Sequence, residues 1–220
     1  MTTTDTDTTA PYSARLRDAS WDAHRAAEGA PYLEALVAGR LDVDGVAALV
    51  AQHYFAYGVL EEAAGAMGGA PIGSRFVDPR LHRTAALRAD LEALLGAAWG
   101  DLVVPNAATT AYCERMREVC FDWAGGFVAH HYVRFLGDLS GGQFIARVLA
   151  DTYGIGPTSG AAFYDFSELG DLTEYKDRYR AELDAAPWSA EEQGRIVAEV
   201  LEGYRCNTEV LLDPTLSELA

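Results

Sequence analysis

The most unusual segment of the chain is a glycine-rich run inside a strong helical pattern. The sequence GDLSGGQ places Gly137, Gly141 and Gly142 in a segment that otherwise favours helix. Each interior glycine disfavours a helix by roughly 1 kcal/mol relative to alanine, so another interaction must offset their cost. Gly137 and Gly141 are four residues apart and share a face that carries no side chains. Close packing of a second helix and contact with a flat ligand both fit this face.

Polar residues flank the glycine run. Asp138 directly follows Gly137 and stands four residues after Arg134, so an ion pair on a solvated helix surface is one interpretation. Small, apolar and aromatic residues surround Asp138 in the sequence. The second interpretation is therefore a carboxylate that holds a water molecule in a dry pocket.

His24 is the candidate metal ligand. Arg17, Trp21 and Glu28 lie seven residues before, three before and four after it, so all four side chains project from one side of a helix. A single histidine on such a face is more often a hydrogen-bonded structural residue than a ligand. The other histidines are His53, His82, His130 and His131. They form no HxxxH or HExxH pair, which disfavours a zinc or di-iron site, whereas a heme iron needs only one histidine.

The charge balance limits the partners of the chain. Asp and Glu number 33 against 17 Lys and Arg, and the net charge of −16 argues against binding nucleic acid or an anionic membrane. Lys176 and Arg180 stand one helical turn apart, either as an ordinary basic edge or as the local patch that an anionic ligand requires. Further donors for carboxylates could come from Arg17, Tyr132, Tyr175 and Tyr179.

Composition and chain ends predict one globular domain. Hydrophobic residues make up 50% and charged residues 23%, which is ordinary for a folded domain. We expect the domain over 12–213, a disordered N-terminal tail over 1–11 and a short C-terminal tail over 214–220. Three scattered cysteines indicate a reducing cytoplasm, and no signal peptide or membrane-spanning run is evident.

Apolar residues recur with helical spacing along the first half of the domain, and none alternates with period two. Ser13 is the expected N-cap of a helix that ends at Gly29. A second, long helix is expected to start near Asp42 or Asp44. Pro79 is expected to open a third helix as its first residue.

The second half continues the helical pattern. Helices are expected over 109–123, over 127–153 with the glycine run inside it, and over 173–185. Ser189 and Glu192 form a capping box for the last helix. Six to eight helices without a strand predict an all-α, single-domain fold.

Together these segments resemble the heme oxygenase family. The similarity covers nearly the whole domain, through SWDAHRAAE, YGVLEE, LHRTAALRADL, AHHYVRFLGDLSGGQ, EYKDRYRAEL and a final helix that carries Asn207. GDLSGGQ in this context is highly specific for that family. The resemblance implies a helical fold in which heme is sandwiched between a proximal first helix and a kinked, glycine-rich distal helix.

The resemblance also implies residue roles around the iron. His24 matches the proximal iron ligand and Glu28 its nearby carboxylate partner. Asp138 matches the aspartate that orders distal water, and Tyr57 and Arg134 match members of the hydrogen-bond network behind it. The glycines that contact the heme face and allow the kink match Gly137, Gly141 and Gly142.

Further positions match the rim and wall of the family's pocket. The positions that hold the heme propionates match Arg17, Tyr132, Lys176 and Arg180. Tyr204 and Asn207 match the part of the last helix that lines the pocket. Trp21 departs from the pattern, because many relatives have a basic residue there. The chain ends at Ala220 without an apolar anchor, as in a soluble bacterial form.

The implied reaction is oxidative cleavage of heme b, with preference for the α-meso carbon, to biliverdin, carbon monoxide and ferrous iron. Heme would be both substrate and cofactor, and dioxygen would be the co-substrate. The electron donor would be ferredoxin with its reductase or a flavin reductase. The enzyme would be a monomer. A heme carrier or sensor without turnover is the main alternative. A thiaminase-like hydrolase or a di-iron oxygenase would need a nucleophilic cysteine or several converging ligands, and Cys113 and Cys120 look like packing residues.

Overall fold

Helices account for all regular secondary structure in residues 10–220, which are those that the computed structural model describes. The expected all-α class is confirmed. Most of the N-terminal tail expected over 1–11 lies outside the described residues, and Pro11 is already the N-cap of the first helix.

The α-helices are α1 (Tyr12–Glu28), α2 (Pro31–Val37), α3 (Val43–Met67), α4 (Thr84–Leu95), α5 (Trp99–Leu102), α6 (Ala107–Val119), α7 (Ala124–His131), α8 (Gln143–Tyr153), α9 (Leu172–Ala185), α10 (Ala190–Leu212) and α11 (Pro214–Ser217). Two π-helical segments, η3 (Tyr132–Leu136) and η4 (Asp138–Gly142), join α7 to α8. Short 3₁₀ turns are η1 (Gly73–Phe76), η2 (Pro79–Leu81), η5 (Ala162–Tyr164) and η6 (Ser167–Leu169).

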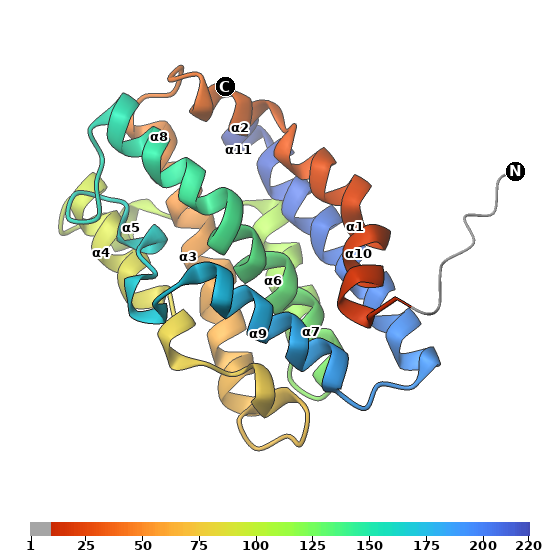
Figure 1. Cartoon of the computed structure of the whole chain (residues 1–220). Coiled ribbons are helices and arrows are strands. Elements are labelled where there is room, and N and C mark those ends of the chain that lie inside the picture. The colour runs from red at the N-terminus through yellow and green to blue at the C-terminus, as the bar shows by residue number, and fades with distance from the viewer. Residues whose placement is uncertain (1–9) are drawn as a thin grey trace, which may run out of the picture.

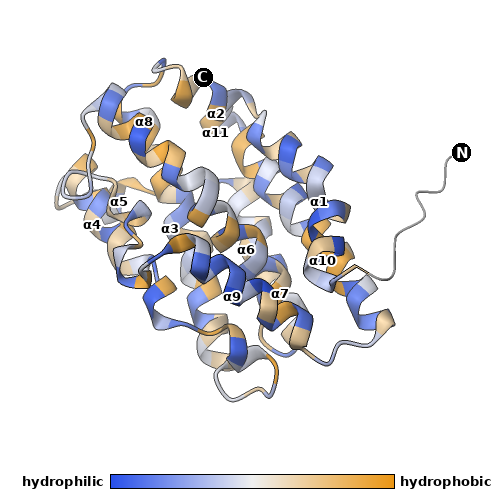
Figure 2. Ribbon diagram, in the orientation of Figure 1, coloured by the Kyte–Doolittle hydropathy of each residue, from blue (hydrophilic) through white to orange (hydrophobic). Residues whose placement is uncertain are grey.

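The long helix α3 lies inside the bundle, where α4, α6 and α7 pack against it. The first and last long helices, α1 and α10, lie side by side although they come from opposite ends of the chain (Figure 1). The core contains fully buried side chains from several helices, among them Leu16, Leu60, Met116 and Val200. Hydrophilic residues are prominent along α1 and α9, whereas α7 is largely apolar (Figure 2).

Two helix starts agree with the expected caps. The Asp42 carboxylate accepts a hydrogen bond from the Gly45 backbone N–H at 2.8 Å and caps α3. The Ser189 hydroxyl accepts one from the Glu192 N–H at 3.1 Å and caps α10. Both interactions satisfy N–H groups that the helix itself leaves without partners.

The expected starts of two other helices, at Ser13 and Pro79, are wrong. Ser13 lies inside α1, and its hydroxyl donates to the Asp184 carboxylate at 2.9 Å, so this side chain joins α1 to α9 rather than capping a helix. Pro79 opens only the 3₁₀ turn η2, and α4 begins at Thr84. Glu61 accepts hydrogen bonds from the Arg83 and Thr84 N–H groups, which satisfies the start of α4 from a neighbouring helix.

The helix expected over 127–153 is present, but its centre is wound as π-helix. The helical backbone runs without a break from α7 through η3 and η4 into α8, and Gly137 between the two π segments keeps helical angles (φ −62°, ψ −52°). We call this stretch, 124–153, the distal helix. π-helical turns inside α-helices occur frequently at functional sites.

The last residues contribute to the fold. Residues 214–217, within the expected C-terminal tail, form α11, whose Leu216 is fully buried. Thr215 accepts a hydrogen bond from the Asn106 side chain at 3.1 Å. Within 10–220, no helix combines the length and the apolar character needed to cross a membrane.

Candidate functional site

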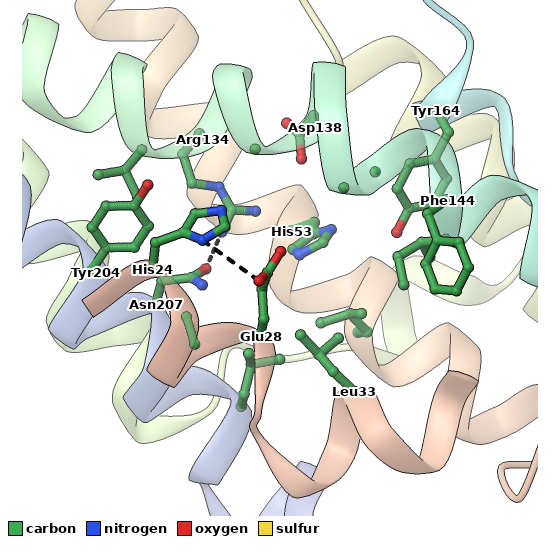
Figure 3. Close-up of a pocket in the computed structure, with 18 of the residues that line it drawn as sticks. His24, Glu28, Leu33, His53, Arg134, Asp138, Phe144, Tyr164, Tyr204 and Asn207 are labelled. Atoms are coloured by element: carbon green, nitrogen blue, oxygen red, sulfur yellow. Dashed lines mark hydrogen bonds and ion pairs between the residues drawn. The ribbon is translucent and has the colours of Figure 1, made fainter. Parts of the chain in front are cut away.

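A cavity of about 330 Å³ opens between α1, the distal helix, α3 and α10. Its volume lies within the range typical of small-molecule and cofactor sites. Nine of the residues singled out from the sequence line it: His24, Glu28, Arg134, Gly137, Asp138, Gly141, Gly142, Tyr204 and Asn207. Figure 3 shows α1 with His24 and Glu28 on one side of this space and the distal helix on the other.

The glycine face of the distal helix is bare toward the cavity. A Cβ atom placed on Gly137 would have no heavy atom of the described residues within 4 Å. One placed on Gly141 would meet only Glu28 Oε1, at 3.8 Å, the end of a flexible side chain. No helix of the described residues packs against these two positions, so helix packing does not explain them and the face is open to a ligand. Gly142 differs, because its Cβ would lie 3.3 Å from the Tyr164 ring, which packs there.

A side chain at Gly137 should separate folding from ligand binding. We expect Gly137→Leu to raise the free energy of unfolding by about 0.5–1 kcal/mol, because leucine favours helix over glycine and its Cβ meets no neighbouring atom there. Heme affinity should fall about tenfold or more, because the side chain fills the cavity. Gly65→Leu is the control, since Gly65 is also helical and uncrowded but lies outside the cavity. Denaturant unfolding and heme titration measure the two effects, and unchanged heme affinity would contradict this assignment.

Aromatic rings hold the His24 imidazole in place. The Trp21 ring stacks on it with centroids 5.4 Å apart and an interplanar angle of 8°, and Tyr204 meets it edge-on at 5.8 Å. Glu28 Oε2 lies 3.6 Å from His24 Nδ1, an ion-pair distance that is too long for a hydrogen bond. Nδ1 is buried and has no hydrogen-bond partner in the described part of the chain. The structural role considered for His24 would require such a partner, so the geometry favours a ligand role.

A network of polar side chains lies behind the glycine face. The Tyr57 hydroxyl donates a hydrogen bond to the Asp138 carboxylate, and the Arg134 guanidinium lies 4.8 Å from the centre of the Tyr57 ring. Arg134 Nη1 donates to the Asn207 side-chain oxygen. Arg134 is only 7% exposed and forms no ion pair with Asp138 among residues 10–220. The interpretation of a solvated surface ion pair is therefore wrong, and the half-buried Asp138 belongs to a network with the buried Tyr57 that faces the cavity.

Burial raises the pKa of Asp138 from 3.8 to about 6, although the Arg134 charge and the Tyr57 hydrogen bond lower it. Because the folded-state pKa lies above the unfolded value, the folded protein binds this proton more tightly, and its stability falls as the pH rises from about 4 to about 6. A shift of about two units corresponds to at most about 3 kcal/mol.

Substitution of Asp138 by a side chain that cannot ionise should remove this effect. We expect heme-free Asp138→Asn to be more stable than the wild type at pH 7 and to lose that advantage below about pH 4. Denaturant unfolding of both proteins across this pH range measures the difference between their free energies of unfolding. The other titrating groups are the same in both proteins, so their contributions cancel in this difference. A difference that does not depend on pH would contradict the raised pKa.

The expected propionate contacts lie outside the cavity wall. Arg17 pairs with Asp18 and Arg180 with Asp177, and both pairs are exposed. Lys176 and Tyr132 do not line the cavity either, but Lys176 contacts the distal helix and Tyr132 is part of it. Lys176 Nζ donates a hydrogen bond to the Leu139 backbone oxygen at 3.2 Å, which connects α9 to η4. Tyr132 is only 7% exposed, and burial raises the pKa of its hydroxyl.

Several lining residues were not singled out from the sequence. His53 and Leu49 stand four residues apart on α3, Phe144 is the second residue of α8, and Tyr164 ends the turn η5. His53 also stands four residues before Tyr57, so the helical repeat of α3 could have placed both on one face. Tyr164 carries no such signal, because η5 is a short turn.

The other chemistries considered find little support. Within 10–220, no three His, Cys, Asp or Glu side chains are grouped so that they could hold a metal ion. Cys113 and Cys120 are buried, and burial raises the pKa of both thiols, which disfavours the thiolate that a nucleophile requires.

Comparison with known proteins gives a consistent result. Residues 10–213 match the family model described as heme oxygenase. A heme oxygenase of Pyropia yezoensis is 31% identical over 204 residues, which cover 93% of this chain and 86% of that relative.

Solved structures agree with the sequence matches. Heme oxygenase-1 of Synechocystis sp. PCC 6803 in complex with heme is 30% identical with a TM-score of 0.87, covering 92% of this chain and 91% of that one. Heme oxygenase-2 of the same organism, in complex with heme and NO, is 29% identical with a TM-score of 0.89, covering 96% and 86%.

Proposed function

The chain belongs to the heme oxygenase family, and from this premise we propose which of its residues carry out the cleavage of heme to biliverdin, carbon monoxide and ferrous iron. The proposed site is the cavity between α1 and the distal helix. One observation carries the proposal: a bare glycine backbone and the His24 imidazole, which forms no hydrogen bond with a protein group in residues 10–220, line the same cavity. A flat macrocycle with a central metal fits both walls.

The proximal residues hold and orient the ligand. Heme supplies the iron that activates dioxygen and the ring that is opened. His24 is the proposed iron ligand, with its ring fixed by Trp21 and Tyr204. Glu28 accepts from Nδ1–H after a small movement, which leaves Nε2 as the nitrogen that binds iron. As an imidazole rather than a thiolate ligand, His24 would leave the iron of a bound heme less electron-rich.

The distal residues are proposed to deliver protons and to shape the distal side of the cavity. Asp138 is the proposed residue that holds a water molecule and delivers protons from it, with Tyr57 and Arg134 fixing the carboxylate. Gly137 and Gly141 leave the backbone of the distal helix without side chains on the cavity side. The bare backbone would let a bound heme approach the distal helix closely, and we propose that this close approach would direct cleavage to the α-meso carbon. Arg17, Tyr132, Lys176 and Arg180 are proposed to hold the propionates at the α9 edge.

The setting of the reaction is also a proposal. External electrons would come from ferredoxin with its reductase or from a flavin reductase, and a monomer of one domain over 12–213 would suffice. All three cysteines are buried and unpaired, which supports a reducing, cytoplasmic compartment.

The regiochemistry can be tested in a single turnover. The protein is loaded with one equivalent of heme and reduced under air, and the biliverdin isomers are separated by chromatography. The proposal predicts the α isomer as the main product. A mixture of isomers, or a different main isomer, would show that this glycine face does not direct attack to the α carbon.

A further inference from the structure

His53 is a polar residue of the cavity wall to which the proposed mechanism assigns no role. It projects from α3 into the same cavity as Asp138 (Figure 3), and Leu33, Leu49 and Ile145 also belong to the lining. The ring meets Tyr57 edge-on at 6.0 Å and tilts against Phe163 at 5.2 Å. Across residues 10–220, neither ring nitrogen forms a hydrogen bond with a protein group.

An imidazole in such a place needs a partner. His53 is half-buried, and because no protein group of the described residues pairs with its ring nitrogens, the partner open to them is water in the cavity. Burial and the positive charge of Arg134 lower the pKa of His53 well below its ordinary value of 6.5. The ring is therefore neutral near pH 7, with one nitrogen that donates and one that accepts a hydrogen bond.

We propose that His53 holds cavity water together with Asp138 and is a positioning residue for proton delivery. Tyr57 links the two, because its hydroxyl donates to Asp138 while its ring contacts His53. A neutral imidazole suits this position, since it can accept from one water molecule and donate to the next without adding charge to the cavity. This inference rests on the proposed role of Asp138 and extends it to α3.

The test compares His53→Leu with His53→Gln in the full-length, heme-loaded protein. Leucine keeps the size of the side chain and removes both hydrogen-bonding atoms, whereas glutamine keeps a donor and an acceptor. We expect His53→Leu to lower kcat about three- to tenfold with heme affinity within about twofold of wild type, because one neutral hydrogen bond to water is lost. His53→Gln should recover most of kcat. The pKa of the acid–alkaline transition of the ferric heme complex should also shift in His53→Leu.

Two controls separate the possible results. His82→Leu removes an exposed histidine outside this cavity and should change neither kcat nor the transition. Asp138→Ala is measured in parallel. If Asp138→Ala loses turnover while His53→Leu keeps both kcat and the transition, the inference about His53 is wrong and the proposed function stands. If Asp138→Ala keeps turnover, the proposed distal mechanism fails first.

Discussion

Asp138→Ala is expected to bind heme with an affinity within about threefold of wild type and to form biliverdin at least about 100-fold more slowly. Positioned acid–base groups contribute about 10²- to 10⁴-fold to rates, and no other carboxylate of the described chain shares the distal side of the cavity. Heme binding should persist, because Asp138 lies in the distal helix whereas the proposed ligand lies in α1. Optical titration measures the affinity, and single-turnover product yield measures the chemistry.

Tyr57→Phe is the matched variant for this prediction. It removes the hydroxyl that donates to Asp138 and keeps the ring that packs against Phe135 and Phe163. We expect a smaller loss of turnover than in Asp138→Ala, because the carboxylate remains and only its orientation is less restricted. Wild-type biliverdin yield in Asp138→Ala would remove Asp138 from the mechanism.

His24→Ala is expected to have the largest effect on heme binding. Replacing a residue that merely orients a metal ligand typically costs 10- to 100-fold in affinity, so loss of the ligand itself should cost about 100-fold or more. The ferric spectrum should lose the features of histidine ligation. Added imidazole should restore them, because removal of the side chain leaves room for imidazole between Trp21 and Tyr204.

His82→Ala is the control for His24→Ala, since His82 lies outside the cavity and is exposed. It should leave the heme spectrum unchanged. An unchanged spectrum in His24→Ala would mean that another residue binds the iron.

The cavity lowers the stability of the heme-free fold in two ways. Gly137 sits in a helix interior without a packing partner, and Asp138 keeps a carboxyl group whose pKa is raised by burial. Both features disfavour the folded chain. Replacing either should therefore stabilise the protein while it impairs function, as is usual for active sites.

Local patterns made much of this site predictable. The helical repeat places Gly137 with Gly141 and His24 with Glu28, and these pairs depend only on residues four apart. Both pairs line the cavity as expected. The caps at Asp42 and Ser189 are equally local.

Contacts between distant segments were harder to predict. Tyr57 and Asp138 are 81 residues apart, and only the family resemblance linked them. Ser13 carries a typical N-cap side chain, but its partner Asp184 lies 171 residues away. The π-helical winding of the distal helix has no simple residue signature, because it depends on how the bare glycine face and its neighbours pack.

One measurement tests the central claim most directly. Heme is added to the purified protein, followed by ascorbate or a ferredoxin reducing system under air, and the absorption spectrum and released carbon monoxide are recorded. The account predicts that a Soret band forms on binding and then decays as biliverdin absorption and about one equivalent of carbon monoxide appear. A stable Soret band without either product would identify a heme carrier or sensor and would contradict the account.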